Sequence, residues 1–254
     1  KAWFFFDKAY VCLGTNISSR MKNPVLTTVN QCLLNGEVTV SDADGIHLQE
    51  QGTRTKKEVR WVVHDKVGYY FLQKENVVLS NQRMEGSWKI ANRQTTVPAD
   101  IVRQDVFTLS IDHGQSPDNG GYAYMVIPSV DSRSVENRVE EEGAVVLANS
   151  PELQAVRHDG LNMAYAVFYK GGTLRINDKI AVEIESPGML MMKYNDSGEI
   201  QMLAVSDPTH FMKKLHLSVN QKIDWAAQEG IQTEWDKEKR KSVVSGRLQT
   251  GDSD

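Results

Sequence analysis

The feature that most constrains the fold is the stretch from Asp105 to Pro128, where apolar and polar residues alternate along two segments. A period of two is typical of a half-buried β-strand, because successive side chains of a strand point to opposite faces. Between the segments lies His113–Gly121, which is rich in Gly, Pro, Asn and Asp and is therefore typical of a turn. The stretch is predicted to form a long β-hairpin, with one face of each strand covered by another sheet.

Strand-like segments fill most of the region before this hairpin. Asn35-Gly36 is predicted to form a tight type I′ turn between strands at 27–34 and 37–40, and Asp42–Gly45 a second turn. Turn signals recur about every eight to twelve residues, a spacing typical of antiparallel sandwiches. Further strands are expected at 59–63, 67–72, 76–79 and 87–90, and the one helix-compatible stretch is 133–142.

A domain boundary is predicted near residues 143–150, because the strand pattern restarts beyond it. The chain is thus predicted to be all-β, with residues 1–142 and 143–254 as two domains. From residue 220 the pattern weakens, and the mixed charges of Asp236–Lys241 are typical of a solvated surface. The expected strands of the second domain are 153–157, 163–169, 173–176, 180–184, 189–194, 200–205 and 214–219.

Composition and charge argue against two classes of protein. Asp and Glu outnumber Lys and Arg by 33 to 29, and the formal net charge is −4, whereas nucleic-acid binders normally carry a basic surface. No apolar run reaches the roughly eighteen residues of a membrane-spanning helix. The chain has neither a signal peptide nor an initiator methionine, so it is expected to be processed or part of something longer. Cys12 and Cys32 lie in apolar runs, and both free thiols and a single disulfide stay open.

Several blocks of the sequence resemble polysaccharide lyase family 8, the chondroitin, hyaluronan and xanthan lyases. The resemblance covers about residues 1–220, and within the family the chondroitin sulfate ABC lyases are the most similar. Several blocks in the same order are far more specific than any one of them. In chain order they are KAWFFFDKAYVCLGTNI, TTVNQCLLNG, WVVHDKVGYYF, GSWKIAN, IDHGQSP with YAYMVIP, and LMMKYNDSGEIQMLAVSDPT.

The resemblance implies a fold and an activity. Residues 1–142 would be the later part of a large antiparallel supersandwich of the galactose mutarotase-like kind, and residues 143–254 a smaller C-terminal β-sandwich. The full enzyme would cleave chondroitin or dermatan sulfate, with hyaluronan as a further candidate, by β-elimination beside a uronic acid. The family uses Asn or His, Tyr, Arg and Glu for this reaction, and all of these lie upstream of the present chain. No catalytic residue is therefore assigned, and the chain alone is expected to be inactive.

The same resemblance implies partners and a location. The partners would be a glycosaminoglycan and the N-terminal α-helical and β portion of the same bacterial enzyme, which would be secreted or periplasmic. No cofactor or metal site is predicted, and a divalent cation in the full enzyme stays open. Because the substrate is a polyanion, Arg103, Arg133 and Arg138 are candidates for the rim of its cleft, although exposed solubilising arginines are the simpler interpretation. The alternative function is a non-catalytic carbohydrate-binding β-sandwich.

The residues themselves predict no independent active site. His113, at a strand end, is expected to hydrogen-bond to the Asp-rich loop rather than act as a ligand or base. His64-Asp65 is a weak pair, because neighbours in a strand point to opposite faces. Asp42–Gly45 has only the start of a calcium-loop pattern. The remaining histidines have no partner at metal-ligand spacing: His47, His158, His210 and His216.

Overall fold

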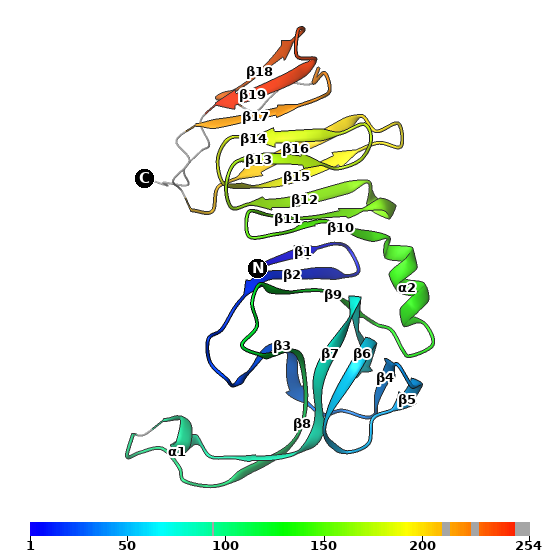
Figure 1. The fold of residues 1–254 in the computed structure, drawn as a ribbon, viewed down its shortest axis with the longest axis vertical. Coiled ribbons are helices and arrows are strands. Elements are labelled where there is room, and N and C mark those ends of the chain that lie inside the picture. The colour runs from blue at the N-terminus through cyan, green and yellow to red at the C-terminus, as the bar shows by residue number, and fades with distance from the viewer. Residues whose placement is uncertain (93, 210–213, 225–228, 247–254) are drawn as a thin grey trace. The chain divides into compact units, whose positions relative to one another are not determined.

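The computed structural model describes all residues except 93, 210–213, 225–228 and 247–254, so His210 and Trp225 lie outside the described part. The chain forms two compact units. The large-sheet unit comprises Phe6–Cys12 and Asn16–Val139, and the sandwich unit comprises Lys1–Phe5, Leu13–Thr15 and Glu140–Asp254. Both are built almost entirely of antiparallel strands (Figure 1), which confirms the predicted all-β class. The division of the chain into domains at residues 1–142 and 143–254 stays a prediction.

In the large-sheet unit the strands follow the order β2-β9-β7-β6-β4-β5, with β8 paired to β7 and β3 paired to β8. Two short helices, α1 and α2, accompany the sheet. The elements are β2 (Tyr10–Ile17), β3 (Pro24–Leu33), β4 (Val38–Asp42), β5 (Gly45–Leu48), β6 (Gly52–His64), β7 (Val67–Gly86), α1 (Trp88–Ala91), β8 (Val102–Gln115), β9 (Gly120–Pro128) and α2 (Val135–Glu142).

The predicted alternation in β8 and β9 is confirmed by the core. Phe107, Leu109 and Ile111 of β8 are fully buried in one cluster, which also holds Tyr124 and Val126 of β9. The segment around the start of α2 contacts β6 and β7. There the indole Nε1 of Trp61 donates a 3.0 Å hydrogen bond to Glu136, and Val130 and Val135 lie close to Gly68. The helix within the predicted range 133–142 is therefore held against these two strands.

The predicted hairpin between β8 and β9 is wrong, because both strands pair with β7 instead. β7 is 20 residues long, and its first part, Val67–Phe71, pairs with β9, whereas Val77–Gly86 pairs with β8. The two strands thus divide one long edge between them. The loop between β8 and β9 is hydrogen-bonded to the segment between β2 and β3. The amide of Ser19 donates to the carbonyl of Pro117, and the hydroxyl of Ser116 donates to the carbonyl of Met21.

Two other predictions for this unit are also wrong. Residues 27–34 and 37–40 do not form a hairpin, because β3 pairs with β8 and β4 pairs with β5 and β6. Gly36 has a φ of 75°, but Asn35 is not among the residues with positive φ, so the turn is not type I′. Residues 87–90, predicted as a strand, begin α1: the β7–β8 ladder ends at Gly86, and Ser87 caps the helix by accepting a hydrogen bond from the amide of Lys89.

The sandwich unit contains two five-stranded sheets, β10-β11-β12-β15-β16 and β13-β14-β17-β19-β18, as Figure 1 shows. One apolar cluster with side chains from both sheets forms its core, including Phe168, Leu190, Ile180 and Leu217. The elements are β1 (Ala2–Phe5), β10 (Ala144–Asn149), β11 (Leu153–His158), η1 (Asp159–Leu161), β12 (Met163–Phe168), β13 (Gly172–Arg175), β14 (Ala181–Ile184), β15 (Gly188–Tyr194), β16 (Ile200–Ser206), β17 (Leu215–Val219), β18 (Ile231–Asp236) and β19 (Lys241–Gly246).

All seven strands predicted for this region are present, and three more were missed. β10 lies in the predicted boundary, and β18 and β19 flank the charged run 236–241, which is the turn between them. Within the described residues, no helix is long and apolar enough to cross a membrane. Cys12 and Cys32 are free, so the disulfide alternative is wrong.

The glycine after His113 gives a direct test of the local backbone. Gly114 has a φ of 73°, and a Cβ added there would meet nothing within 4 Å, so a substitution would add backbone strain without a clash. We expect Gly114→Val to lower the free energy of unfolding by about 1–3 kcal/mol. Gly86→Val is the matched control, because Gly86 has the same open space and no left-handed φ. Equal losses in the two variants, measured by urea unfolding, would contradict the strain argument.

Candidate functional site

The chemically reactive side chains of this chain fall into separate clusters, each of which has partners of its own. His113 is the first. Its Nε2 lies 2.8 Å from the hydroxyl of Thr27 on β3, and burial lowers its pKa. The nearby Asp112 carboxylate accepts the amide of Gly114. The prediction that the ring bonds to its own loop is therefore wrong. The ring instead connects β8 to β3.

Cys32 and His64 form a pair that sequence spacing did not reveal, because they are 32 residues apart. The Sγ of Cys32 lies 3.8 Å from Nδ1 of His64, whose Nε2 accepts a 3.0 Å hydrogen bond from the amide of Asn35. With Nε2 accepting, Nδ1 carries the hydrogen of the neutral ring and points it at the sulfur. Burial also raises the pKa of the thiol. The ring therefore cannot take a proton from Cys32, and the arrangement does not activate a nucleophile.

His47 belongs to a third cluster, at the β4–β5 turn. Its Nε2 accepts a 2.9 Å hydrogen bond from the ammonium of Lys56, which forms an ion pair with Asp42 at 3.3 Å. The prediction of a turn at Asp42–Gly45 is confirmed. Among the described residues, no group of three or more His, Cys, Asp and Glu side chains is placed to hold a metal ion.

His158 and Glu142 form a buried pair in the sandwich unit. Nε2 of the ring lies 3.0 Å from Oε2 of the carboxylate, with side-chain exposures of 4% and 7%. Nδ1 accepts a hydrogen bond from the amide of Leu161, so Nε2 carries the hydrogen and donates it to Glu142. The pair fastens the end of α2 to the end of β11. Periodicity gave no signal for it, because the two residues lie on different elements.

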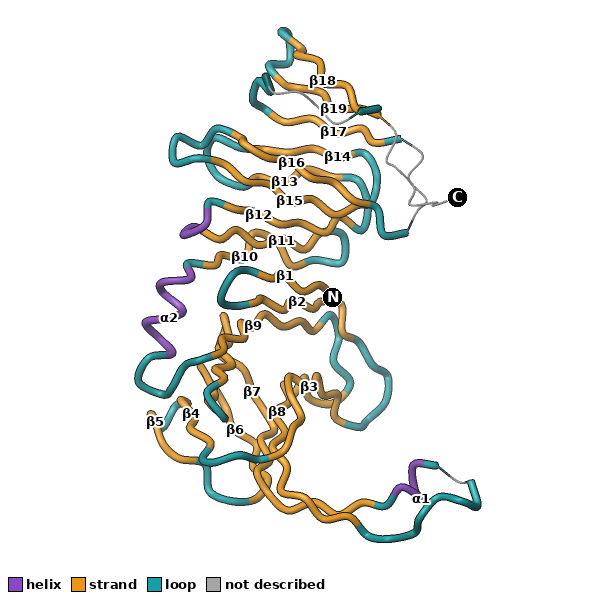
Figure 2. Tube along the Cα trace, turned by 180° about the vertical axis from the view of Figure 1, so that it is seen from behind, coloured by secondary structure: helices purple, strands orange, loops and turns teal. Residues whose placement is uncertain are grey.

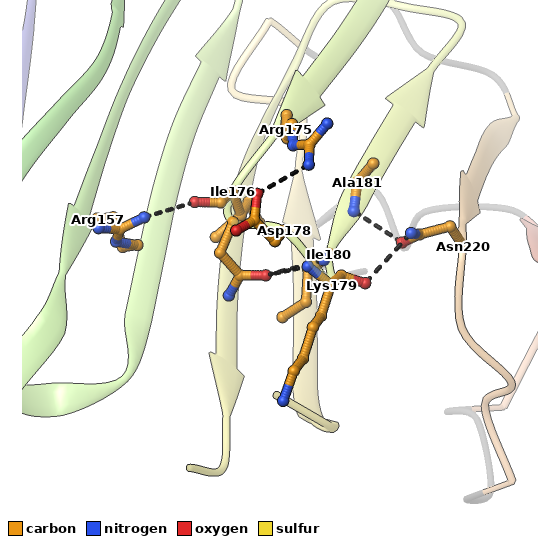
Figure 3. Close-up of polar contacts among 9 residues, drawn as sticks. Arg157, Arg175, Ile176, Asp178, Lys179, Ile180, Ala181 and Asn220 are labelled. Atoms are coloured by element: carbon orange, nitrogen blue, oxygen red, sulfur yellow. Dashed lines mark hydrogen bonds and ion pairs between the residues drawn. The ribbon is translucent and has the colours of Figure 1, made fainter. Parts of the chain in front are cut away.

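Basic side chains gather around the turn between β13 and β14 (Figure 3). Arg157 donates to the carbonyl of Ile176 at 2.9 Å, Arg175 pairs with Asp178, and the ammonium of Lys179 donates to Ser197. Figure 3 shows that the charged ends point in different directions rather than toward one point. The cluster therefore stabilises the turn and does not form a converging anion site.

The three predicted glycan-contacting arginines lie in two places. Arg103 lies in β8 and forms an exposed ion pair with Glu85 across the β7–β8 ladder. Arg133 is exposed in the turn before α2, where its amide donates to Asp131, and Arg138 is half-buried within α2. Arg133 and Arg138 share one short segment, whereas Arg103 lies at the start of β8. Their contact with a glycan stays a prediction.

Three shallow grooves lie among the described residues. One, of about 440 Å³, lies on the β7–β8 ribbon next to Trp88. The other two, of about 440 and 300 Å³, share Val167 and Met189 on the sandwich unit, where Trp3, Tyr165 and Tyr169 also contribute to the lining. All three are mostly apolar, and none of the three is lined by a histidine or cysteine of the clusters described above.

Burial raises the pKa of the Glu75 carboxyl group strongly, to about 7. In the sequence of β7, Glu75 stands between two buried residues, Phe71 and Val77. Across the sheet it pairs in register with the buried Val59 of β6. Because the folded state holds this proton more tightly than the unfolded state, folding stability falls as the pH rises from about 4.5 to about 7.

Replacing Glu75 with glutamine removes this titration. We expect Glu75→Gln to be nearly neutral at a pH of about 4.5 and to stabilise the chain by about 1–2 kcal/mol at a pH of about 8. Urea unfolding at both pH values measures the difference, and the exposed Glu37→Gln is the control. A stabilisation that does not change with pH would contradict the assignment.

Both parts of the chain match domain models of a known protein family. Residues 1–139 match the model of the polysaccharide lyase family 8 super-sandwich domain, and residues 145–216 match that of the family 8 C-terminal beta-sandwich domain. The chain belongs to polysaccharide lyase family 8. The family resemblance seen in the sequence is therefore confirmed.

Individual family 8 members support the assignment. Chondroitinase-AC of Pedobacter heparinus is 36% identical over 90% of this chain, and the xanthan lyase of Bacillus sp. is 27% identical over 82%. A solved chondroitinase AC lyase structure is 32% identical, covers 97% of the chain and has a TM-score of 0.80. The chondroitin sulfate ABC exolyase of Bacteroides thetaiotaomicron is 24% identical, which is less than the chondroitinase AC relative.

The chain covers only part of the length of its family 8 relatives. The chain spans 33% of the chondroitinase AC relative and 23% of the xanthan lyase. About two thirds of the chondroitinase AC relative thus has no counterpart in these 254 residues.

Proposed function

We propose that this chain is the C-terminal β region of a bacterial lyase that cleaves chondroitin or dermatan sulfate by β-elimination, with hyaluronan as a further candidate. The observation that carries the proposal is the 36% identity to chondroitinase AC over 90% of the chain, together with a span of only a third of that enzyme. In this proposal the catalytic groups lie in the remainder of the protein. The chain supplies structural support for them.

The clusters of the chain agree with a supporting role. β-Elimination needs a group that neutralises the uronate carboxylate, a base for the C5 proton and an acid for the leaving oxygen. His113 is bonded to Thr27, and Cys32 accepts from the ring of His64. His158 is buried with Glu142. Each group is committed to a partner within the fold rather than to a substrate.

The proposal includes partners and a location. The partners are the glycosaminoglycan and the helical and β portion of the same enzyme. The protein acts outside the cytoplasm, secreted or in the periplasm, because a sulfated matrix polysaccharide is too large and too charged to cross a membrane unaided. Recovery of the protein from the culture medium or the periplasmic fraction checks the location.

An activity assay tests the proposal directly. We expect the purified 254-residue chain to give no turnover of chondroitin sulfate, dermatan sulfate or hyaluronan, whereas the intact protein that contains it produces an unsaturated uronate that absorbs in the ultraviolet. Turnover by the chain alone, at a rate near that of the intact protein, would place the catalytic groups within it. Absence of turnover by the intact protein, combined with glycan binding, would favour the carbohydrate-binding alternative.

A further inference from the structure

The end of the β7–β8 ribbon, together with α1, forms an arm of residues 84–92 and 94–102 that extends away from the other strands of the large-sheet unit (Figures 1 and 2). Its two strands remain paired up to Gly86 and Val102, so the base of the arm is a regular ladder. Two-stranded ribbons are only marginally stable in water unless something covers one face. The composition of the two faces indicates which one is covered.

One face of the arm, called here the apolar face, is mainly apolar and also carries Gln104, which lies opposite Met84. Met84 and Val102 lie on it with Val106, and they line the groove next to Trp88. The apolar side chains of the arm are unusually exposed: 48% for Met84, 67% for Trp88, 82% for Ile90, 56% for Ile101 and 44% for Val102. These five are among sixteen exposed large apolar side chains in the described residues, and three of them, Met84, Trp88 and Val102, line the same groove.

The opposite face of the arm carries charges that cancel. Arg83 pairs with Asp105 at 3.1 Å, and Arg103 pairs with Glu85 at 2.5 Å, each across the ladder. Neither guanidinium is thus free for a polyanion. The other face carries Met84, Val102 and Val106 with the neutral amides of Gln82 and Gln104 among them, so it offers a sulfated glycan no positive charge. The surface has the chemistry of a protein contact, with an apolar centre and a polar rim.

We propose that the apolar face of the arm docks onto the part of the same enzyme that lies outside these 254 residues. The inference rests on the proposed function, because that function requires the remainder of a lyase. The argument for this occupant is the length of the missing part: the chondroitinase AC relative is about three times as long as the region that the chain matches. An arm that reaches out of its own unit and presents Ile90 and Trp88 is suited to such a contact.

Amide hydrogen exchange tests the docking. Residues 84–102 are followed in the 254-residue chain and in the intact protein. Exchange of this segment is expected to be at least about tenfold slower in the intact protein. The β4–β5 turn is the internal reference and exchanges at the same rate in both. Ile90→Ser in the intact protein is expected to restore fast exchange of the arm. The control Ile46→Ser, at a side chain that is 61% exposed on β5, leaves the arm protected.

The other outcomes overturn the proposal. Equal exchange of the arm in both proteins means that nothing covers it. Protection that appears only with added chondroitin sulfate identifies a glycan as the occupant, and protection that rises with protein concentration identifies a second copy. An intact natural protein with the mass of this chain leaves no remainder to dock. A protected arm in an intact protein without lyase activity would instead overturn the proposed function and leave the docking in place.

Discussion

Replacing Phe107 with alanine is expected to lower the free energy of unfolding of the large-sheet unit by about 3–5 kcal/mol. Phe107 is fully buried, its ring stacks on His64 with a centroid distance of 4.3 Å, and it lies 6.0 Å from the ring of Tyr69. It lies on β8 where that strand pairs with both β3 and β7, opposite Cys32 and Asn81. Truncation thus removes apolar contact at the junction of three strands and leaves a cavity.

The measurement is unfolding in urea, monitored by hydrogen exchange of the backbone amides of β6, β7 and β8. These amides report on the large-sheet unit alone. Leu33→Ala is the control, because Leu33 is a large apolar residue of the same unit, on β3 beside β8, at 63% exposure. The control is expected to change stability by less than about 0.5 kcal/mol. If Phe107→Ala cost no more than Leu33→Ala, the cluster around β8 would not be the core of the unit.

The second large effect is expected at the buried pair of His158 and Glu142. Glu142→Leu leaves the Nε2 hydrogen of the ring buried without an acceptor, and we expect it to lower the free energy of unfolding of the sandwich unit by about 2–4 kcal/mol. Glu142→Gln keeps an oxygen that can accept the same hydrogen, so the expected loss is smaller, about 1 kcal/mol or less. The difference between the two variants isolates the hydrogen bond from the packing.

The control for this pair comes from the same helix. Glu140 is exposed, so Glu140→Leu is expected to leave the stability of the sandwich unit within about 0.5 kcal/mol of the original. The measurement is hydrogen exchange of β11 and β12 during urea unfolding. Equal losses for Glu142→Leu and Glu142→Gln would mean that the hydrogen bond contributes nothing and that only the shape of the side chain matters.

The sequence reveals which face of a strand is buried more readily than it reveals the neighbouring strand. The alternation of Phe107, Leu109 and Ile111 identified a core face correctly, because a period of two is a local property of the backbone. The same reasoning assigned β8 to β9 and β3 to β4, and both pairings are wrong. Adjacent strands often pair, but here one strand of 20 residues, β7, provides enough edge for two partners.

For the titratable side chains too, the sequence reveals local features but not the partner of each residue. Cys32 with His64 and His158 with Glu142 were not predicted, because each pair is brought together by strand pairing or by the end of a helix. His113 was correctly given a structural role but the wrong partner, since Thr27 is 86 residues away in the sequence. The strand predicted at 87–90 is a helix because the ladder ends at Gly86, and a local pattern cannot reveal where a ladder ends.

The sequence by itself determined the all-β class, most strands, the buried faces, the helix near residues 135–142 and the polysaccharide lyase family, because these depend on local periodicity or on ordered blocks of residues. Only the tertiary structure decided how β7 divides its edge, which titratable groups meet, and that an apolar arm extends from the large-sheet unit. The physical reason is that hydrogen bonds between strands and contacts between side chains join residues far apart in the chain. Their pairing is selected by the burial of the whole unit rather than by any one segment.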